Sequence, residues 1–266
     1  MHDPRKCLIV ALDVPSAAAA QDLVAAVGDA AYCYKVGMQL YTAEGPQVVR
    51  DLVASGRKVF LDLKYHDIPN TVASAVREAA QLGVSMLTVH ALGGAKMLRA
   101  ATDAAAVNPE LIVLAVTVLT SLDDKDLDQL GVHARLQDQV LRLAELALKN
   151  GCRGIVASAR EAAELRGKLG EKFAIVTPGV RLSGGDHADQ ARVVTPAQAI
   201  AAGATHIVVG RPITEAKDPG ATARAIVREM TDARDRVLSD SNAEELHRDA
   251  MDAFEYQAPL WDRPED

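Results

Sequence analysis

The sequence predicts an α/β fold, a single (β/α)8 TIM barrel with a C-terminal extension, from three observations. Short β-branched apolar runs alternate with longer stretches in which Ala, Leu and Val recur every three or four residues, which is the helical period. Eight strand candidates can be counted along the chain. The length of 266 residues also suits one barrel, a fold that typically takes about 250 residues.

The strand candidates are apolar runs bounded by Gly, Pro or polar residues. They cover residues 7–13, 32–37, 58–64, 86–90, 111–118, 154–158, 173–179 and 206–211. The run 111–116 is apolar throughout, as expected for a parallel strand with both faces covered. An open doubly wound sheet is the alternative, but it is typically marked by a Gly-rich first turn, and residues 13–16 read Asp-Val-Pro-Ser.

The helices between these strands have recognisable starts and ends. Ser16, Thr42 and the pair Thr195-Pro196 are typical of helix starts. Four glycines are typical of helix ends: Gly56, Gly83, Gly151 and Gly203. After residue 234 the pattern becomes polar and acidic. We therefore expect a barrel over 1–234 and an extension of unknown role over 235–266, with a helix at 241–256 packed on the outside of the barrel.

Composition excludes several classes of function. The formal charge of −7 leaves no basic excess for binding nucleic acid. No apolar run approaches the roughly 20 residues that span a bilayer, and the N-terminus lacks the apolar stretch of a signal peptide. Cys7, Cys33 and Cys152 lack the spacing of a disulfide framework or a zinc site, which predicts buried, reduced thiols. We expect a cytoplasmic protein without a nucleic-acid or membrane partner.

Polar residues gather where the predicted strands end. In a barrel these ends face the functional site, so charged residues there need an explanation. The strand candidates carry Asp13, Lys35, Asp62, Lys64, His90 and Arg211 at or near these ends. One such charge alone would be read as a salt bridge at the barrel mouth. Burying Lys35, Asp62, Lys64 and Asp67 together would cost several kcal/mol per ion, which favours an array built for a reaction. Residues two apart on a strand share a face, so Asp62 and Lys64 should be neighbours.

Residues 62–71, Asp-Leu-Lys-Tyr-His-Asp-Ile-Pro-Asn-Thr, resemble the D-x-K-x-x-D-I-x-x-T signature of the orotidine 5′-phosphate decarboxylase family. Other landmarks of that family follow in order, over residues 7 to about 230. They are 11–13 (Ala-Leu-Asp), 35–37 (Lys-Val-Gly), 119–121 (Leu-Thr-Ser), 177–181 (Thr-Pro-Gly-Val-Arg), 189–190 (Asp-Gln) and 209–211 (Val-Gly-Arg). The resemblance implies decarboxylation of orotidine 5′-phosphate to uridine 5′-phosphate and CO₂, the last step of UMP synthesis.

The resemblance also implies a role for each catalytic residue. Lys64 would protonate the ring carbon that loses CO₂, and Asp67 would hold Lys64. Asp62 would lie beside the substrate carboxylate, and Lys35 would hold Asp62 and a substrate hydroxyl. Negative charge at the carbon needs preorganised cations in a water-poor pocket, which suits this set.

The substrate-binding residues are carried over in the same way. The pyrimidine would be met by Thr120 and Ser121, the ribose by Asp13, Lys35 and the partner's Thr71, and the phosphate by Arg181, Gln190, Gly210 and Arg211. Asp62 and Pro178 complete the substrate-binding residues that the resemblance implies. The loop that begins with Asp67 and Thr71 crosses to a second subunit in the family, which implies a homodimer with shared active sites.

The resemblance leaves two alternatives open. One is a Mg²⁺-dependent sugar-phosphate decarboxylase or lyase of the same superfamily, and the other is a non-catalytic barrel that binds a nucleotide phosphate. The resemblance implies no cofactor. No metal is expected, because Lys64 would place a competing cation among Asp62, His66 and Asp67, and no His-rich spacing appears elsewhere. His66 and His90 are interpreted as hydrogen-bonded structural residues.

Overall fold

The structure is a computed structural model that describes residues 3–182 and 194–255, with side chains described as far as Ser239. Eight parallel strands follow one another around a closed barrel, each paired with the next and β8 with β1. The strands are β1 (Leu8–Ala11), β2 (Cys33–Gly37), β3 (Lys58–Tyr65), β4 (Met86–His90), β5 (Ile112–Val116), β6 (Gly154–Val156), β7 (Ala174–Thr177) and β8 (His206–Val209).

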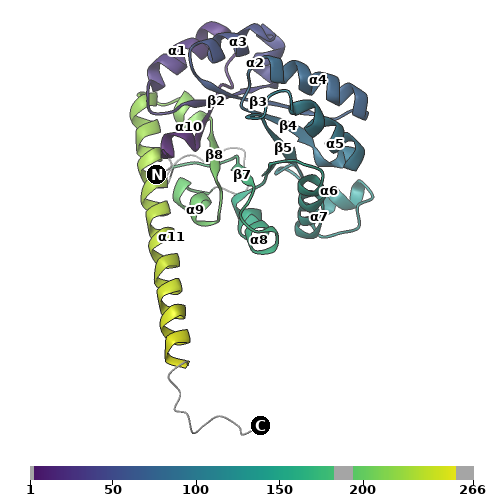
Figure 1. The fold of residues 1–266 in the computed structure, drawn as a ribbon. Coiled ribbons are helices and arrows are strands. Elements are labelled where there is room, and N and C mark those ends of the chain that lie inside the picture. The colour runs from purple at the N-terminus through teal and green to yellow at the C-terminus, as the bar shows by residue number, and fades with distance from the viewer. Residues whose placement is uncertain (1–2, 183–193, 256–266) are drawn as a thin grey trace, which may run out of the picture.

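The helices surround this barrel (Figure 1). They are η1 (Pro4–Lys6), α1 (Ala17–Val27), α2 (Met38–Glu44), α3 (Gln47–Ala54), α4 (Pro69–Gln81), η2 (Ala91–Gly93), α5 (Gly94–Ala105), α6 (Asp124–Gln129), α7 (Leu136–Lys149), α8 (Ala159–Leu169), α9 (Pro196–Ala201), α10 (Arg211–Thr214) and α11 (Pro219–Glu255).

The predicted barrel is confirmed, and the open-sheet alternative is excluded by the pairing of β1 with β8. All eight strand candidates are strands. Several are shorter than predicted, because residues such as Asp13 and Arg211 have already left the sheet for the site or the next helix.

Most predicted helix boundaries also agree with the structure. The side chain of Ser16 accepts a hydrogen bond from Ala19 N at 3.2 Å, and that of Thr195 accepts one from Gln198 N at 3.1 Å. All four glycines predicted at helix ends have positive φ angles, between 79° and 95°. Thr42 was wrongly predicted as a start, because α2 follows β2 without a loop and Thr42 lies inside it.

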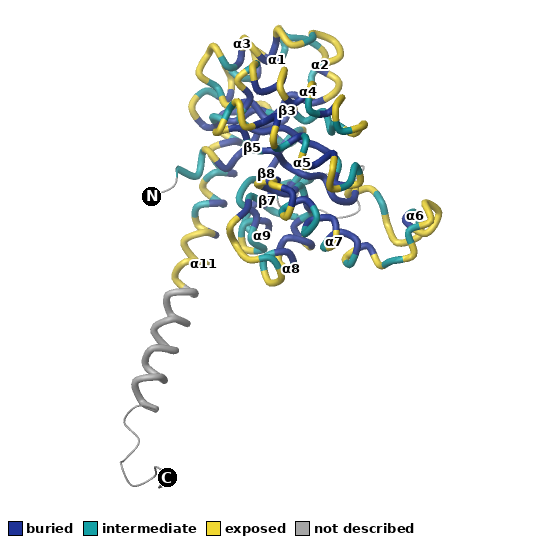
Figure 2. Tube along the Cα trace, turned by 45° about the vertical axis from the view of Figure 1, so that its right-hand side comes forward, coloured by how far each residue is buried: buried dark blue, intermediate teal, exposed yellow. Residues whose placement is uncertain are grey.

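The core has two layers, which appear as the dark blue centre of Figure 2. The larger layer lies between the strands and the helices. The smaller fills the barrel with inward-facing side chains: Ile9, Ala11, Cys33, Phe60, Met86, Leu114, Val176 and Val208. The barrel interior is therefore packed, and a site must lie at one of its ends.

The long helix α11 continues past residue 234, where the sequence pattern suggested that the last helix of the barrel ends. Its backbone is helical from Pro219 to Glu255, and its C-terminal half extends beyond the barrel (Figure 1). The reason is that residues 221–255 contain no Gly or Pro to end a helix. The division into a barrel over 1–234 and an extension over 235–266 stays a prediction.

The three cysteines are free and buried, as predicted. Burial raises the pKa of the Cys33 and Cys152 thiols to about 12, so both stay protonated at neutral pH. Among the described residues, no helix is long and apolar enough to cross a membrane.

Candidate active site

Charges alternate in sign across the carboxyl ends of β1, β2 and β3. Lys35 Nζ lies 2.9 Å from Asp13 Oδ1 and 3.9 Å from Asp62 Oδ2. Lys64 Nζ lies 2.9 Å from Asp62 Oδ1. Each inner member of the row Asp13, Lys35, Asp62 and Lys64 thus has an oppositely charged neighbour on either side.

The inner charges of this row are largely withdrawn from water. The side chains of Lys35 and Asp62 are only 12% and 14% exposed, that of Lys64 is 26% exposed, and that of Asp13 is 55% exposed. Ions at such depth are stable only when paired, and removing one would leave its neighbour buried and uncompensated. The row is therefore a set of fixed charges, and its two end members, Lys64 and Asp13, are the ones more exposed at the mouth of the barrel.

The backbone beneath Asp62 and Lys64 is irregular. Lys64 has a φ of +52°, the one positive value among the described non-glycine residues. The pairing of β3 with β4 shifts its register between Leu61 and Tyr65. Asp62 and Lys64 therefore meet across a bulge, rather than by the regular alternation of strand faces that the sequence suggested.

A residue that the sequence did not single out lies at this bulge. Thr88 on β4 is 1% exposed, and its hydroxyl accepts a hydrogen bond from Lys64 N at 2.9 Å and donates one to Asp62 Oδ1 at 3.0 Å. In the sequence it stands inside a buried strand pattern, where Thr reads as an ordinary strand residue.

Gly37 at the end of β2 leaves room for the Lys35 ammonium. A Cβ atom at this position would lie 2.9 Å from Lys35 Nζ and 3.4 Å from Asp13 Oδ1. A side chain at residue 37 would displace the Lys35 ammonium, so glycine at this position lets Lys35 reach Asp13 and Asp62.

Asp67 and Thr71 lie apart from the charge row. Both are exposed. Within the described residues, the Asp67 carboxylate accepts a hydrogen bond from Ile68 N at 2.6 Å and makes no ion pair with Lys64. The structure of one chain thus brings together four of the predicted charges and leaves Asp67 outside.

The remaining predicted residues follow β5, β7 and β8. Thr120 and Ser121 are exposed beyond β5. Pro178 and Arg181 follow β7, where Arg181 N donates to Val194 O at 3.1 Å. Gly210 and Arg211 begin α10 after β8. These residues surround the same end of the barrel as the charge row, whereas Gln190 lies outside the described residues.

Two histidines stand beside the row. The rings of His66 and His90 are 5.4 Å apart between centroids, tilted by 32°. Burial, and after it the neighbouring His66 and Lys64, lower the pKa of His90 below its ordinary 6.5. His90 is therefore neutral at physiological pH and adds no positive charge next to Lys64.

Several polar atoms near this end of the barrel are buried without a hydrogen-bond partner among the described residues. They are His90 Nδ1, Thr117 Oγ1 and Thr177 Oγ1, at or just after the ends of β4, β5 and β7. Buried polar atoms usually have partners, so this end has hydrogen-bonding capacity that a polar molecule could use. No group of three His, Cys, Asp or Glu side chains suited to a metal is present in the described part of the chain.

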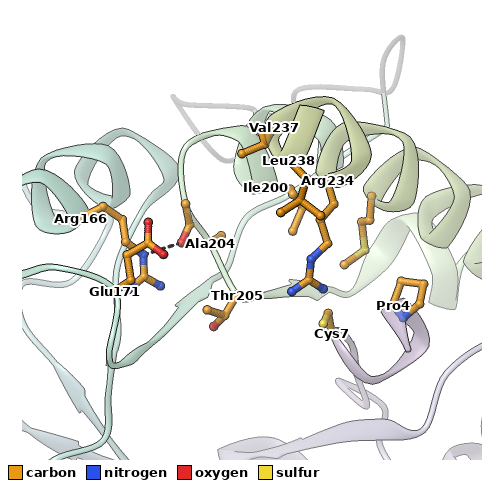
Figure 3. A pocket seen from close by; sticks show the side chains of 12 residues that line it. Pro4, Cys7, Arg166, Glu171, Ile200, Ala204, Thr205, Arg234, Val237 and Leu238 are labelled. Atoms are coloured by element: carbon orange, nitrogen blue, oxygen red, sulfur yellow. Dashed lines mark hydrogen bonds between the residues drawn. The ribbon is translucent and has the colours of Figure 1, made fainter. Parts of the chain in front are cut away.

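The opposite end of the barrel contains a cavity of about 220 Å³ (Figure 3). Cys7, Thr205 and Arg234 contribute to its lining, and they stand before β1, before β8 and on α11. Burial raises the pKa of the Cys7 thiol, and the nearby Arg234 guanidinium opposes part of that shift. This cavity lies away from the end where barrels hold their sites.

Comparisons with known proteins match the sequence to one family. The chain matches the model of the Orotidine 5'-phosphate decarboxylase / HUMPS family over residues 6–226. It is 51% identical over 237 residues to the orotidine 5'-phosphate decarboxylase of Moorella thermoacetica, covering 86% of this chain and 94% of the relative. It is 52% identical over 227 residues to that of Halorhodospira halophila, covering 85% and 96%.

A solved structure is similar as well. The crystal structure of the orotidine 5'-phosphate decarboxylase of Lactobacillus acidophilus superimposes with a TM-score of 0.76 at 39% identity, covering 85% of this chain and 99% of that one.

Proposed function

Because the chain belongs to the Orotidine 5'-phosphate decarboxylase / HUMPS family, we propose that it converts orotidine 5′-phosphate to uridine 5′-phosphate and CO₂. One observation carries the proposal. Lys35, Asp62 and Lys64 form a largely buried series of ion pairs in a chain that is about half identical to named decarboxylases. The Mg²⁺-dependent and non-catalytic alternatives are not favoured by these relatives.

The reaction breaks the bond between the pyrimidine ring carbon and its carboxylate. The bonding electrons stay on the carbon, CO₂ leaves, and a proton must replace it. Lys64 can do both tasks: its ammonium stabilises the developing negative charge and then delivers the proton. Its 26% exposure is consistent with a group that opens toward a bound substrate.

Asp62 and Lys35 set the field around Lys64. Asp62 accepts from Lys64 and fixes the direction of the ammonium, while Lys35 offsets the Asp62 charge from the other side. A substrate carboxylate placed beside Asp62 would be repelled there, and the repulsion would be relieved as CO₂ leaves. Lys35 and Asp13 are also placed to bind hydroxyl groups of the ribose.

The rest of the substrate would lie over the ends of β5, β7 and β8. Thr120 and Ser121 would bind the pyrimidine. Pro178, Arg181, Gln190, Gly210 and Arg211 would hold the phosphate end, in agreement with the usual phosphate position after strands seven and eight of such barrels. Binding energy gained at the phosphate can then lower the barrier at the ring.

We further propose that two chains form a homodimer and that each completes the other's site. Apolar side chains are exposed after four successive strands: Met38 (55%), Ile68 (68%), Leu92 (55%) and Leu119 (39%). They surround the charge row at the face that a second chain would cover. Asp67 directly precedes Ile68 and Thr71 follows three residues after it, so that face would bring a partner's Asp67 toward Lys64.

We also propose a cytoplasmic location, because phosphorylated nucleotides are retained inside cells.

An assay with a chelator tests the function. The chain is incubated with EDTA and orotidine 5′-phosphate, and loss of the orotate chromophore is followed. The proposal predicts prompt loss at the same rate with and without EDTA. Loss that stops in EDTA and returns with Mg²⁺ would support the metal-dependent alternative, whereas binding without any loss would support the phosphate-binding alternative.

A further inference from the structure

We propose that Thr88 is a positioning residue for this reaction: its buried hydroxyl holds Asp62 and the backbone of Lys64 in the arrangement that the chemistry uses. The inference rests on the proposed function, because it assigns a role within the same site. Thr88 itself lies behind the charged groups and is not expected to touch the substrate.

The register of the sheet explains why a side chain is needed here. Leu61 pairs with Leu87 and Tyr65 with Val89. Three residues of β3 therefore stand opposite the single residue Thr88 of β4, where a regular pair would have one. The backbone ladder cannot satisfy the extra groups in such a bulge.

The Thr88 hydroxyl takes over the missing connections. Its oxygen accepts from Lys64 N at 2.9 Å, which gives a partner to the N–H group at the residue with a φ of +52°. The same hydroxyl donates to Asp62 Oδ1 at 3.0 Å. Because Thr88 is 1% exposed, bulk water cannot easily replace either bond when the hydroxyl is removed.

These two bonds connect the backbone geometry to the charges. Asp62 Oδ1 receives both the Thr88 hydroxyl and Lys64 Nζ, so its lone pairs are directed toward fixed donors. The second oxygen, Oδ2, then faces Lys35 at 3.9 Å. Loss of the hydroxyl would free the carboxylate to rotate and the Lys64 backbone to relax, and both changes would move the ammonium relative to the reacting carbon.

Three substitutions separate positioning from folding. Thr88→Val keeps the shape and removes the hydroxyl, and Thr88→Ser keeps the hydroxyl and removes a methyl group. Thr205→Val is the matched control, because the Thr205 hydroxyl also bonds to backbone, accepting from Ile175 N and donating to Ile175 O at 3.0 Å, but at the opposite end of the barrel. The kcat and KM for orotidine 5′-phosphate, the Kd for UMP and the Tm are measured for each.

We expect Thr88→Val to lower kcat by roughly 10- to 100-fold, in line with the loss seen when groups that orient metal ligands are removed. KM and the UMP Kd should change less than about threefold, since the phosphate is held elsewhere. The kcat of Thr88→Ser should stay within about threefold of that of the unchanged chain. Thr205→Val should have a lower Tm and an unchanged kcat. If Thr88→Val does not fold, Thr88→Cys, with its weak donor and acceptor, should show the same loss of kcat.

Two results would overturn the role of Thr88. One is an unchanged kcat in Thr88→Val or Thr88→Cys. The other is a kcat in Thr88→Ser that falls as far as in those two variants, because the loss would then come from the missing methyl group and not from the hydroxyl. Absence of turnover by the unchanged chain would instead refute the proposed function, and the role of Thr88 would fall with it.

Discussion

Lys64 Nζ lies 2.9 Å from Asp62 Oδ1 although the strand between them is bulged and Lys64 has a φ of +52°. A positive φ at a non-glycine residue costs on the order of 1–2 kcal/mol. The surrounding structure offsets this cost through the Thr88 bonds and the paired charges. Backbone strain at a charged pair is typical of a site where position matters more than local stability.

Replacing Arg211 by Ala tests the phosphate end of the site. We expect kcat/KM to fall by about 100-fold, or roughly 2.7 kcal/mol, because binding energy at the phosphate would be lost in the transition state. A second assay uses the unchanged chain and a truncated substrate that lacks the phosphate group. Free phosphite should partly restore turnover of this substrate. An unchanged kcat/KM in the Arg211→Ala enzyme would remove this residue from the proposal.

Mixing two inactive variants tests the shared site. If the partner's Asp67 completes each site, a mixed dimer of Lys64→Ala and Asp67→Ala chains has one intact site and one with both lesions. Random exchange makes about half of the dimers mixed, so activity should return to roughly one quarter of that of the unchanged chain. Mass spectrometry confirms the exchange. Mixed dimers that are demonstrably formed but remain inactive would contradict the shared site.

The half-buried His90 side chain predicts a dependence of stability on pH. Its pKa is lower in the folded chain than its ordinary 6.5, so the unfolded chain takes up a proton first as the pH falls. Its contribution to stability is therefore fully present above about pH 6.5 and is lost progressively below it. The drop in Tm from pH 7.5 to 5.5 should be smaller in His90→Gln than in the unchanged chain, as measured by thermal unfolding.

Equal drops in Tm for His90→Gln and the unchanged chain would mean that His90 does not contribute to the acid sensitivity.

The barrel could be predicted from sequence because its signals are local. Runs such as 111–116 are apolar along their whole length, and glycines such as Gly83 and Gly151 end helices with left-handed φ angles. The length of α11 was missed because the sequence becomes polar and acidic after residue 234, although the absence of Gly and Pro from 221 to 255 was a usable signal.

The candidate site was only partly predictable. Charges at strand ends indicated Lys35, Asp62 and Lys64, because polar residues at such positions need a reason. The bulge could not be read from the sequence, since Asp62 and Lys64 are spaced like residues on one face of a regular strand. Thr88 was missed for the same reason, because its role depends on the register between two strands. The roles of the individual site residues stay predictions.

Replacing Lys64 by Ala tests the central claim most directly. Turnover of orotidine 5′-phosphate and binding of UMP are measured on the same preparation, with Lys58→Ala at the amino end of β3 as the matched control. If Lys64 supplies the proton while the phosphate is held elsewhere, Lys64→Ala abolishes decarboxylation and still binds UMP, and Lys58→Ala retains both. Near-normal turnover by Lys64→Ala would contradict the account.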